Sequence, residues 1–178
     1  YFVLSLGSVN AATTGKFILK NTSLSVLGSE QANTFKDIID IDQEITWEVH
    51  VPKNYNPDNP PGVLVYVSPQ SEIKIPSGWI DATEENNLIW IAARKSGNKI
   101  ISPRRILFAL MSIALLQNDY QINEERIYIT GFSGGGRIAS IVATSYPNIF
   151  DGAIYNCGAN FWESKTDEQI GLIKKSNY

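Results

Sequence analysis

The stretch RIYITGFSGGGR, residues 126–137, places a single serine among four glycines. Ser133 comes directly after a short run of branched and aromatic residues, which predicts a buried strand. Residues 136–146, which follow it, have the pattern of a helix. A hydroxyl at such a strand-to-helix turn stands clear of its surroundings. It can then attack a carbonyl carbon, provided that a base removes its proton.

Two well-known glycine motifs fit this stretch only in part. A phosphate loop has the spacing of Gly131 and Gly136, but it needs a lysine where Arg137 stands. A dinucleotide fingerprint fits residues 134–139, but its ribose-binding acid belongs at the end of the next strand, and Asp151 precedes that strand. Each motif therefore lacks a residue that its chemistry requires.

A third motif, the nucleophile elbow G-x-S-x-G, is complete in residues 131–135. The elbow holds its serine in a strained backbone conformation, and side chains two positions before and after it would collide. Gly131 and Gly135 occupy those two positions. The N–H of Gly134 would point at a developing oxyanion near the helix N-terminus. We therefore predict that Ser133 is a nucleophile, the alternative being an ordinary glycine-rich turn with an exposed serine.

The elements around this turn predict an α/β fold. Residues 44–52 alternate as a strand does, and residues 16–27 have the pattern of a strand or hairpin. A buried helix should begin at Ser102 as N-cap with Pro103 in its first turn, and the tail should start a further helix. Continuous apolar runs predict strands buried on both faces, at residues 63–67, 88–94, 126–130 and 152–158.

Buried strands that alternate with helices predict parallel pairing. We therefore expect a three-layer αβα sandwich with a mostly parallel sheet. Ligands of such sheets bind at the carboxyl ends of the strands. The loops 68–76, 131–135 and 159–162 should meet there.

Composition narrows the classes of function. The chain has 178 residues and a net charge of −3, which argues against nucleic acid as a partner. Cys157 and His50 are the only residues of their types, so a disulfide framework and a multi-histidine metal site are excluded. We expect no cofactor, no metal and no membrane span, and the composition does not predict an oligomeric state.

The first eleven residues, YFVLSLGSVNA, are apolar and end in small residues, as the tail of a secretory signal peptide does. An ordinary first strand is the alternative. On the first interpretation the protein is secreted or periplasmic, and residues 12–178 form a single domain.

Residues 125–161, together with the upstream segment VHVPKNYNPDNPPGVLVYVSP, resemble secreted α/β-hydrolase esterases. They are most similar in type to the polyhydroxybutyrate-depolymerase and feruloyl-esterase-like group. The resemblance covers residues 44–162 and implies an α/β-hydrolase fold that is incomplete at its C-terminus. It also implies hydrolysis of a small-molecule or polymeric carboxylic ester through an acyl-serine intermediate.

The resemblance assigns roles to individual residues. Ser133 would be the acylated nucleophile and Gly134 one oxyanion donor. The second donor follows a His-Gly pair in the family. Here Ser68-Pro69 replaces that pair, and because proline has no N–H, Gln70 becomes the expected donor. We expect substrate-binding side chains at Phe132, Phe161 and Trp162.

The catalytic base of the family is not found in this sequence. The family places an acid and then a histidine after the serine, whereas His50 lies in an upstream strand. Glu163 has the position of an acid in some lipases. Three explanations stay open: a truncated chain, a second chain that completes the site, or a degenerate copy. The alternative function is a non-catalytic binding protein on a hydrolase fold.

Overall fold

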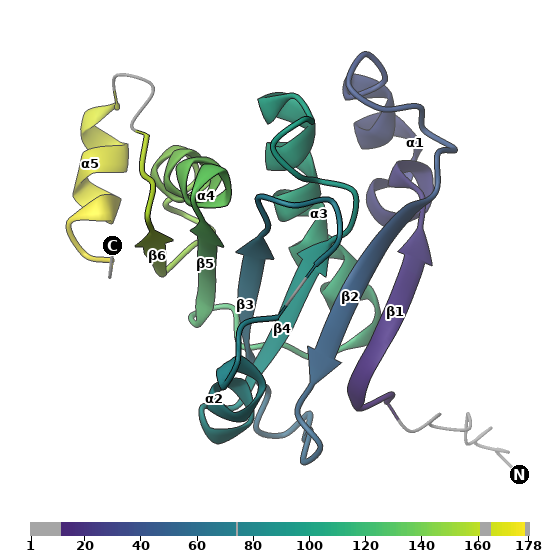
Figure 1. The fold of residues 1–178 in the computed structure, drawn as a ribbon, viewed down its shortest axis with the longest axis vertical. Coiled ribbons are helices and arrows are strands. Elements are labelled where there is room, and N and C mark those ends of the chain that lie inside the picture. Colours follow the sequence, from purple (N-terminus) through teal and green to yellow (C-terminus); the bar gives the residue numbers. More distant parts are fainter. Residues whose placement is uncertain (1–11, 74, 161–164, 177–178) are drawn as a thin grey trace, which may run out of the picture.

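The computed structural model describes residues 12–73, 75–160 and 165–176. Six strands form one sheet in the order β1-β2-β4-β3-β5-β6 (Figure 1). The strands are β1 (Gly15–Asn21), β2 (Ile45–Val51), β3 (Gly62–Val67), β4 (Leu88–Ala93), β5 (Ile127–Phe132) and β6 (Gly152–Asn156). β4, β3, β5 and β6 pair in parallel, and β1 and β2 form an antiparallel extension of the sheet beside β4.

Helices cover both faces of the sheet, which confirms the predicted three-layer architecture (Figure 1). The helices are α1 (Ser23–Thr34), α2 (Trp79–Glu85), α3 (Ser102–Asp119), α4 (Gly134–Ser145) and α5 (Asp167–Ile173). α3 and α4 pack on one face of the sheet, with α1 against α3 and α5 against α4, and α2 packs on the other face against β4. None of the helices in the described ranges is long and apolar enough to cross a membrane.

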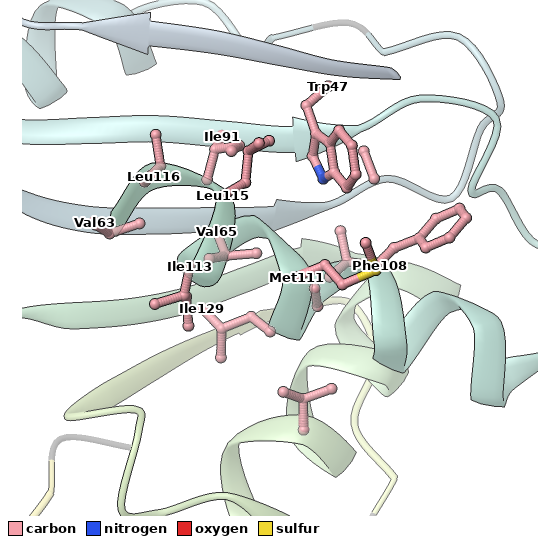
Figure 2. Close-up of a cluster of buried hydrophobic side chains, with 14 of the residues drawn as sticks. Trp47, Val63, Val65, Ile91, Phe108, Met111, Ile113, Leu115, Leu116 and Ile129 are labelled. Atoms are coloured by element: carbon pink, nitrogen blue, oxygen red, sulfur yellow. The ribbon is translucent and has the colours of Figure 1, made fainter. Parts of the chain in front are cut away.

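The larger core lies between the sheet and α3 (Figure 2). Alternate residues of the central strands point into it, as Val63 and Val65 of β3 do, and their neighbour Leu64 belongs to the smaller core under α2. This explains why these strands have continuous apolar sequences: each residue is buried on one face or the other. Trp47 is fully buried, and its indole N–H donates to the hydroxyl of Ser112 on α3 at 3.1 Å.

The sequence predicted some element boundaries incorrectly. Residues 16–27 are not one strand or hairpin, because α1 begins at Ser23, where the Thr22 hydroxyl accepts a hydrogen bond from the Ser25 N–H. Ser102 is the first residue of α3 rather than its N-cap, and Ile101 caps the helix without a side-chain hydrogen bond. α2 was not predicted.

Candidate active site

Ser133 lies between the last residue of β5 and the first residue of α4, at the carboxyl end of the parallel strands. Its backbone has φ 53° and ψ −119°, a combination that non-glycine residues rarely adopt. The hydroxyl does not cap α4, although serine favours that role at an N-cap position. The side chain is partly exposed. The hydroxyl is therefore free of the local bond that would normally hold it.

Close backbone contacts hold this strained turn. A Cβ atom on Gly131 would lie 2.8 Å from the amide nitrogen of Gly136 and closer still to the carbonyl group of Gly135. A Cβ atom on Gly135 would collide with the carbonyl oxygen of Val67, at the end of β3. Such separations are below van der Waals contact, so both positions require glycine.

One hydrogen bond attaches the turn to the neighbouring strand, and a second joins it to α4. The Ser133 N–H donates to the carbonyl of Asn156 on β6 at 2.7 Å, and the Arg137 N–H donates to the Ser133 carbonyl at 3.1 Å. Gly158 packs directly against that same carbonyl. The segment after β6 therefore supports the backbone on one side, while the end of β3 supports it on the other.

Two N–H groups near this turn were predicted as oxyanion donors. Gly134 is the first residue of α4, so no carbonyl within the helix can accept its N–H. The Gln70 N–H donates to the Ser68 hydroxyl at 3.0 Å. Its role stays a prediction, and it requires the Ser68 side chain to release this bond when an oxyanion forms.

His50 is far from Ser133. Strand register places His50 of β2 level with Tyr128 of β5, and Ser133 lies five positions further along. That offset alone is about 16 Å, before the spacing between strands is added. His50 is also buried, and its Nε2 lies 2.8 Å from Oε1 of Glu84 on α2. Because the sequence has no other histidine, it provides no imidazole within reach of the serine.

The remaining predicted residues have different outcomes. Phe132 is 49% exposed at the end of β5, directly before the serine. Phe161, Trp162 and Glu163 lie outside the described residues, as does the segment 1–11. The described residues contain no cluster of three or more His, Cys, Asp or Glu side chains that could hold a metal ion.

Two residues beside the turn were missed by the sequence analysis. Arg105, on α3, is only 5% exposed and donates a hydrogen bond to the Gly134 carbonyl at 3.3 Å. Asn98, in the loop after β4, has its side chain against Gly134, where a Cβ atom would collide with it. No local pattern marks either residue, because both depend on how loops from different strands meet.

We compared the chain with known proteins and with solved structures. The model of the prolyl oligopeptidase family matches residues 108–175, which run from α3 to α5 and are less than half of the chain. No curated protein in the comparison matches the sequence.

Several solved enzymes have a similar structure. A thermostable esterase has a TM-score of 0.54 and 22% identity, over 76% of this chain and 41% of its own. Acetyl xylan esterase from Aspergillus awamori has a TM-score of 0.52 and 16% identity, over 61% of this chain and 45% of its own. Acylaminoacyl peptidase from Pyrococcus horikoshii has a TM-score of 0.53 and 17% identity, over 66% of this chain and 22% of its own.

The chain thus spans less than half the length of these proteins. At these identities the likeness concerns the fold alone. The strand order, the parallel strands β3 to β6 and the covering helices agree with it. This chain has the α/β-hydrolase fold.

Proposed function

We propose that this chain carries the nucleophile of a serine hydrolase that cleaves carboxylic esters. The observation that carries the proposal is the backbone of Ser133, with φ 53° and ψ −119°, at the junction of β5 and α4. A fold rarely maintains such strain at a residue of no use, since it costs of order 1–3 kcal/mol. Here the strain directs the hydroxyl away from the helix that it would otherwise cap.

The proposed reaction has two halves. Ser133 Oγ attacks the ester carbonyl carbon while a base takes its proton, and the carbonyl oxygen becomes an oxyanion. The N–H of Gly134 and the positive end of the α4 dipole stabilise this charge. The C–O bond to the alcohol then breaks, the alcohol leaves with a proton, and an acyl-serine remains. Water attacks the acyl-serine and releases the carboxylic acid and the free serine.

The base that this reaction needs is not His50, because that side chain is buried beneath α2 at the other end of the strands. A histidine would have to come from outside these 178 residues, because His50 is the only one in the sequence. Without such a base, catalysis by Ser133 should fall to the residual effect of binding and oxyanion contacts.

The chain also offers a surface for an apolar group of the substrate. Phe132 exposes about half of its side chain next to the serine, and an aromatic or acyl group can pack against such a ring. This supports an aromatic ester, as in feruloyl esters, or an aliphatic polyester. Export of the protein, which residues 1–11 led us to expect, belongs to the same proposal.

Hydrolysis of a peptide bond is a second candidate, favoured by the match of residues 108–175 to the prolyl oligopeptidase family. Amide and ester cleavage share the acyl-serine step but differ in the leaving group. Turnover of a feruloyl or p-nitrophenyl ester, compared with an N-acetylated peptide amide, therefore distinguishes the two candidates.

A fluorophosphonate probe tests the proposal directly. We expect it to label Ser133 in the full-length protein, with the modified peptide identified by mass spectrometry. Ser133→Ala should abolish the label, whereas Ser29→Ala, at an exposed serine of α1, should leave it unchanged. An unlabelled Ser133 in the folded full-length protein would contradict the proposal and favour a non-catalytic binding protein.

A further inference from the structure

Arg105 is a buried cation with no carboxylate partner among the described residues. It is 5% exposed, and the ion pairs of the described side chains do not include it. Burial lowers the pKa of its guanidinium, yet arginine keeps its charge in proteins. A charge in this setting is costly unless it is paired or hydrogen-bonded. The hydrogen bonds of the guanidinium therefore indicate what Arg105 does.

The guanidinium donates to three backbone carbonyls. Its Nε donates to Ser96 at 2.9 Å, one Nη to Ser68 at 3.0 Å and the other Nη to Gly134 at 3.3 Å. Ser68 and Ser96 follow β3 and β4, and Gly134 follows the proposed nucleophile. One side chain thus joins the ends of three adjacent strands of the sheet.

The loop after β4 fixes the loop after β3 from a second side. The Lys95 N–H donates to the Ser71 carbonyl at 2.8 Å, and the Asn98 N–H donates to the Pro69 carbonyl at 2.9 Å. Gly97 packs so closely that a Cβ atom there would lie 2.7 Å from the Ser71 nitrogen. The loop after β4, itself bound by Arg105, therefore acts as a rigid support.

We propose that Arg105 is a positioning residue that sets the distance between the Gly134 N–H and the loop that carries Gln70. The proposal rests on the ester hydrolysis proposed above, since these are the two sides of its oxyanion site. Oxyanion donors must lie within a few tenths of an ångström of the developing charge. Gly135 already packs against Val67 and Ser68 at the end of β3, and the Arg105 guanidinium adds directed hydrogen bonds to the carbonyls of Ser68 and Gly134 on either side of this contact. Arginine suits this task because its planar fork binds several acceptors at fixed angles, which an ammonium group cannot do.

The test compares Arg105→Lys and Arg105→Gln with the same changes at Arg104. Arg104 precedes it on α3, but its guanidinium lies over the Phe108 ring, 5.3 Å from the centroid, and not on the loops. We measure kcat and KM for an ester, the rate of fluorophosphonate labelling of Ser133, and the thermal unfolding midpoint, all in the full-length protein. Arg105→Lys keeps the charge and Arg105→Gln removes it, so the pair separates charge from geometry.

We expect both Arg105 variants to lose about 10- to 100-fold in kcat and in labelling rate, with KM changed less than about threefold. The Arg104 variants should stay within about twofold of the original protein. A purely structural role would lower the unfolding midpoint without this separation of kcat from KM.

Other outcomes overturn the inference. If Ser133 is labelled normally and Arg105→Lys retains its kcat, the positioning role is wrong, although the proposed function stands. If neither Arg105 variant folds, Arg105 is a folding residue and has no separate positioning role. Failure of the original protein to be labelled would instead contradict the proposed function itself.

Discussion

The strained backbone of Ser133 is possible only because Gly131 and Gly135, two positions before and after it, have no side chains. The turn is tight because the backbones of Gly131 and Gly135 touch, and it is fixed because Gly135 presses on the Val67 carbonyl. Any Cβ atom at these glycines would separate the elbow from the sheet. The reactivity proposed for the hydroxyl therefore depends on the absence of a Cβ atom at both glycines.

Gly131→Ala tests this dependence. The added methyl group would collide with the backbone of Gly135, so we expect a loss of about 1–3 kcal/mol in the free energy of unfolding. Labelling of Ser133 should slow as well, because the serine moves away from the Gly134 N–H. Chemical denaturation and the labelling rate measure the two effects.

Gly171→Ala is the matched control. Gly171 lies within α5, and a Cβ atom there would have no neighbour within 4 Å. Alanine should stabilise this helix by about 0.5–1 kcal/mol and leave labelling unchanged. Equal effects of the two substitutions would show that the contact at Gly131 has no importance.

Not every residue of the site could be predicted from the sequence. The spacing of Gly131, Ser133 and Gly135 could be recognised in the sequence, because a tight turn at the serine requires residues without side chains two positions before and after it. Arg105 has no such signature, because Arg104 beside it has the same side chain. The two differ only in the side of α3 on which they lie. Its partners are backbone carbonyls of other loops, which have no sequence signal.

At the scale of elements, the C-terminal end of α3 is attached to the segment just before β1. Its C-cap, Tyr120, is 6% exposed, donates its hydroxyl to the Thr13 carbonyl at 2.7 Å and packs edge-on against Tyr55. Burial raises the pKa of Tyr120 to about 12, and the charges of Asp119 and Tyr55 add to the increase. This hydroxyl therefore stabilises the fold only while it is protonated.

Tyr120→Phe should change the dependence of stability on alkaline pH. An unfolded tyrosine has a pKa of about 10. Between pH 10 and 12 the unfolded chain has lost a proton that the folded protein keeps, so the free energy of unfolding falls as pH rises. Phenylalanine removes this contribution, and the decline should become shallower. Tyr66, whose pKa burial also raises, is present in both proteins and cancels in the comparison.

The same pair of proteins at pH 7 gives the reference value. There the difference in the free energy of unfolding should reflect only the lost hydrogen bond to Thr13, about 0.5–1.5 kcal/mol. Parallel declines above pH 10 would mean that Tyr120 ionises as readily in the folded protein as in the unfolded chain.

Most elements were predictable, and the errors have physical causes. The strands β3, β4 and β5 were found because short apolar runs bounded by turn residues favour buried strands. The run at 152–158 also predicted a strand, but the expectation that it is buried on both faces was wrong: β6 ends at Asn156, lies at the edge of the sheet and exposes Ile154. The start of α1 was missed because branched residues before and after Thr22 also fit a strand, and only the structure shows that its hydroxyl caps a helix. α2 is a short helix, too short for a helical period to show.

At the scale of the whole molecule, the two faces of the sheet are unequal. The face under α3 and α4 holds the main core, whereas the face under α2 is covered only in part. On β6, Ile154 is 56% exposed on this second face, while Ile129 of the adjacent strand β5 is fully buried in the main core. Strand order and this asymmetry could not be predicted, since they depend on pairings between distant segments.

The difference in burial between the two faces predicts that isoleucine-to-alanine substitutions on them lower the free energy of unfolding by different amounts. Ile129→Ala should lower the free energy of unfolding by about 2–5 kcal/mol, because it leaves a cavity in the main core. Ile154→Ala should cost about 0.5 kcal/mol or less. Urea denaturation measures both, and a large cost at Ile154 would show that this face is packed in solution.

The contact between Gly135 and the Val67 carbonyl joins segments that are distant in the chain. Such contacts are slow to form, because the entropy of closing the loop must be lost before the contact can compensate for it. Until β3 and β5 pair, the Val67 carbonyl cannot hold Gly135, so one of the contacts that fix the Ser133 backbone is missing. On a nascent chain at the ribosome, we therefore expect the Ser133 hydroxyl to be as unreactive as that of an ordinary serine. It should become a nucleophile only when the sheet is complete.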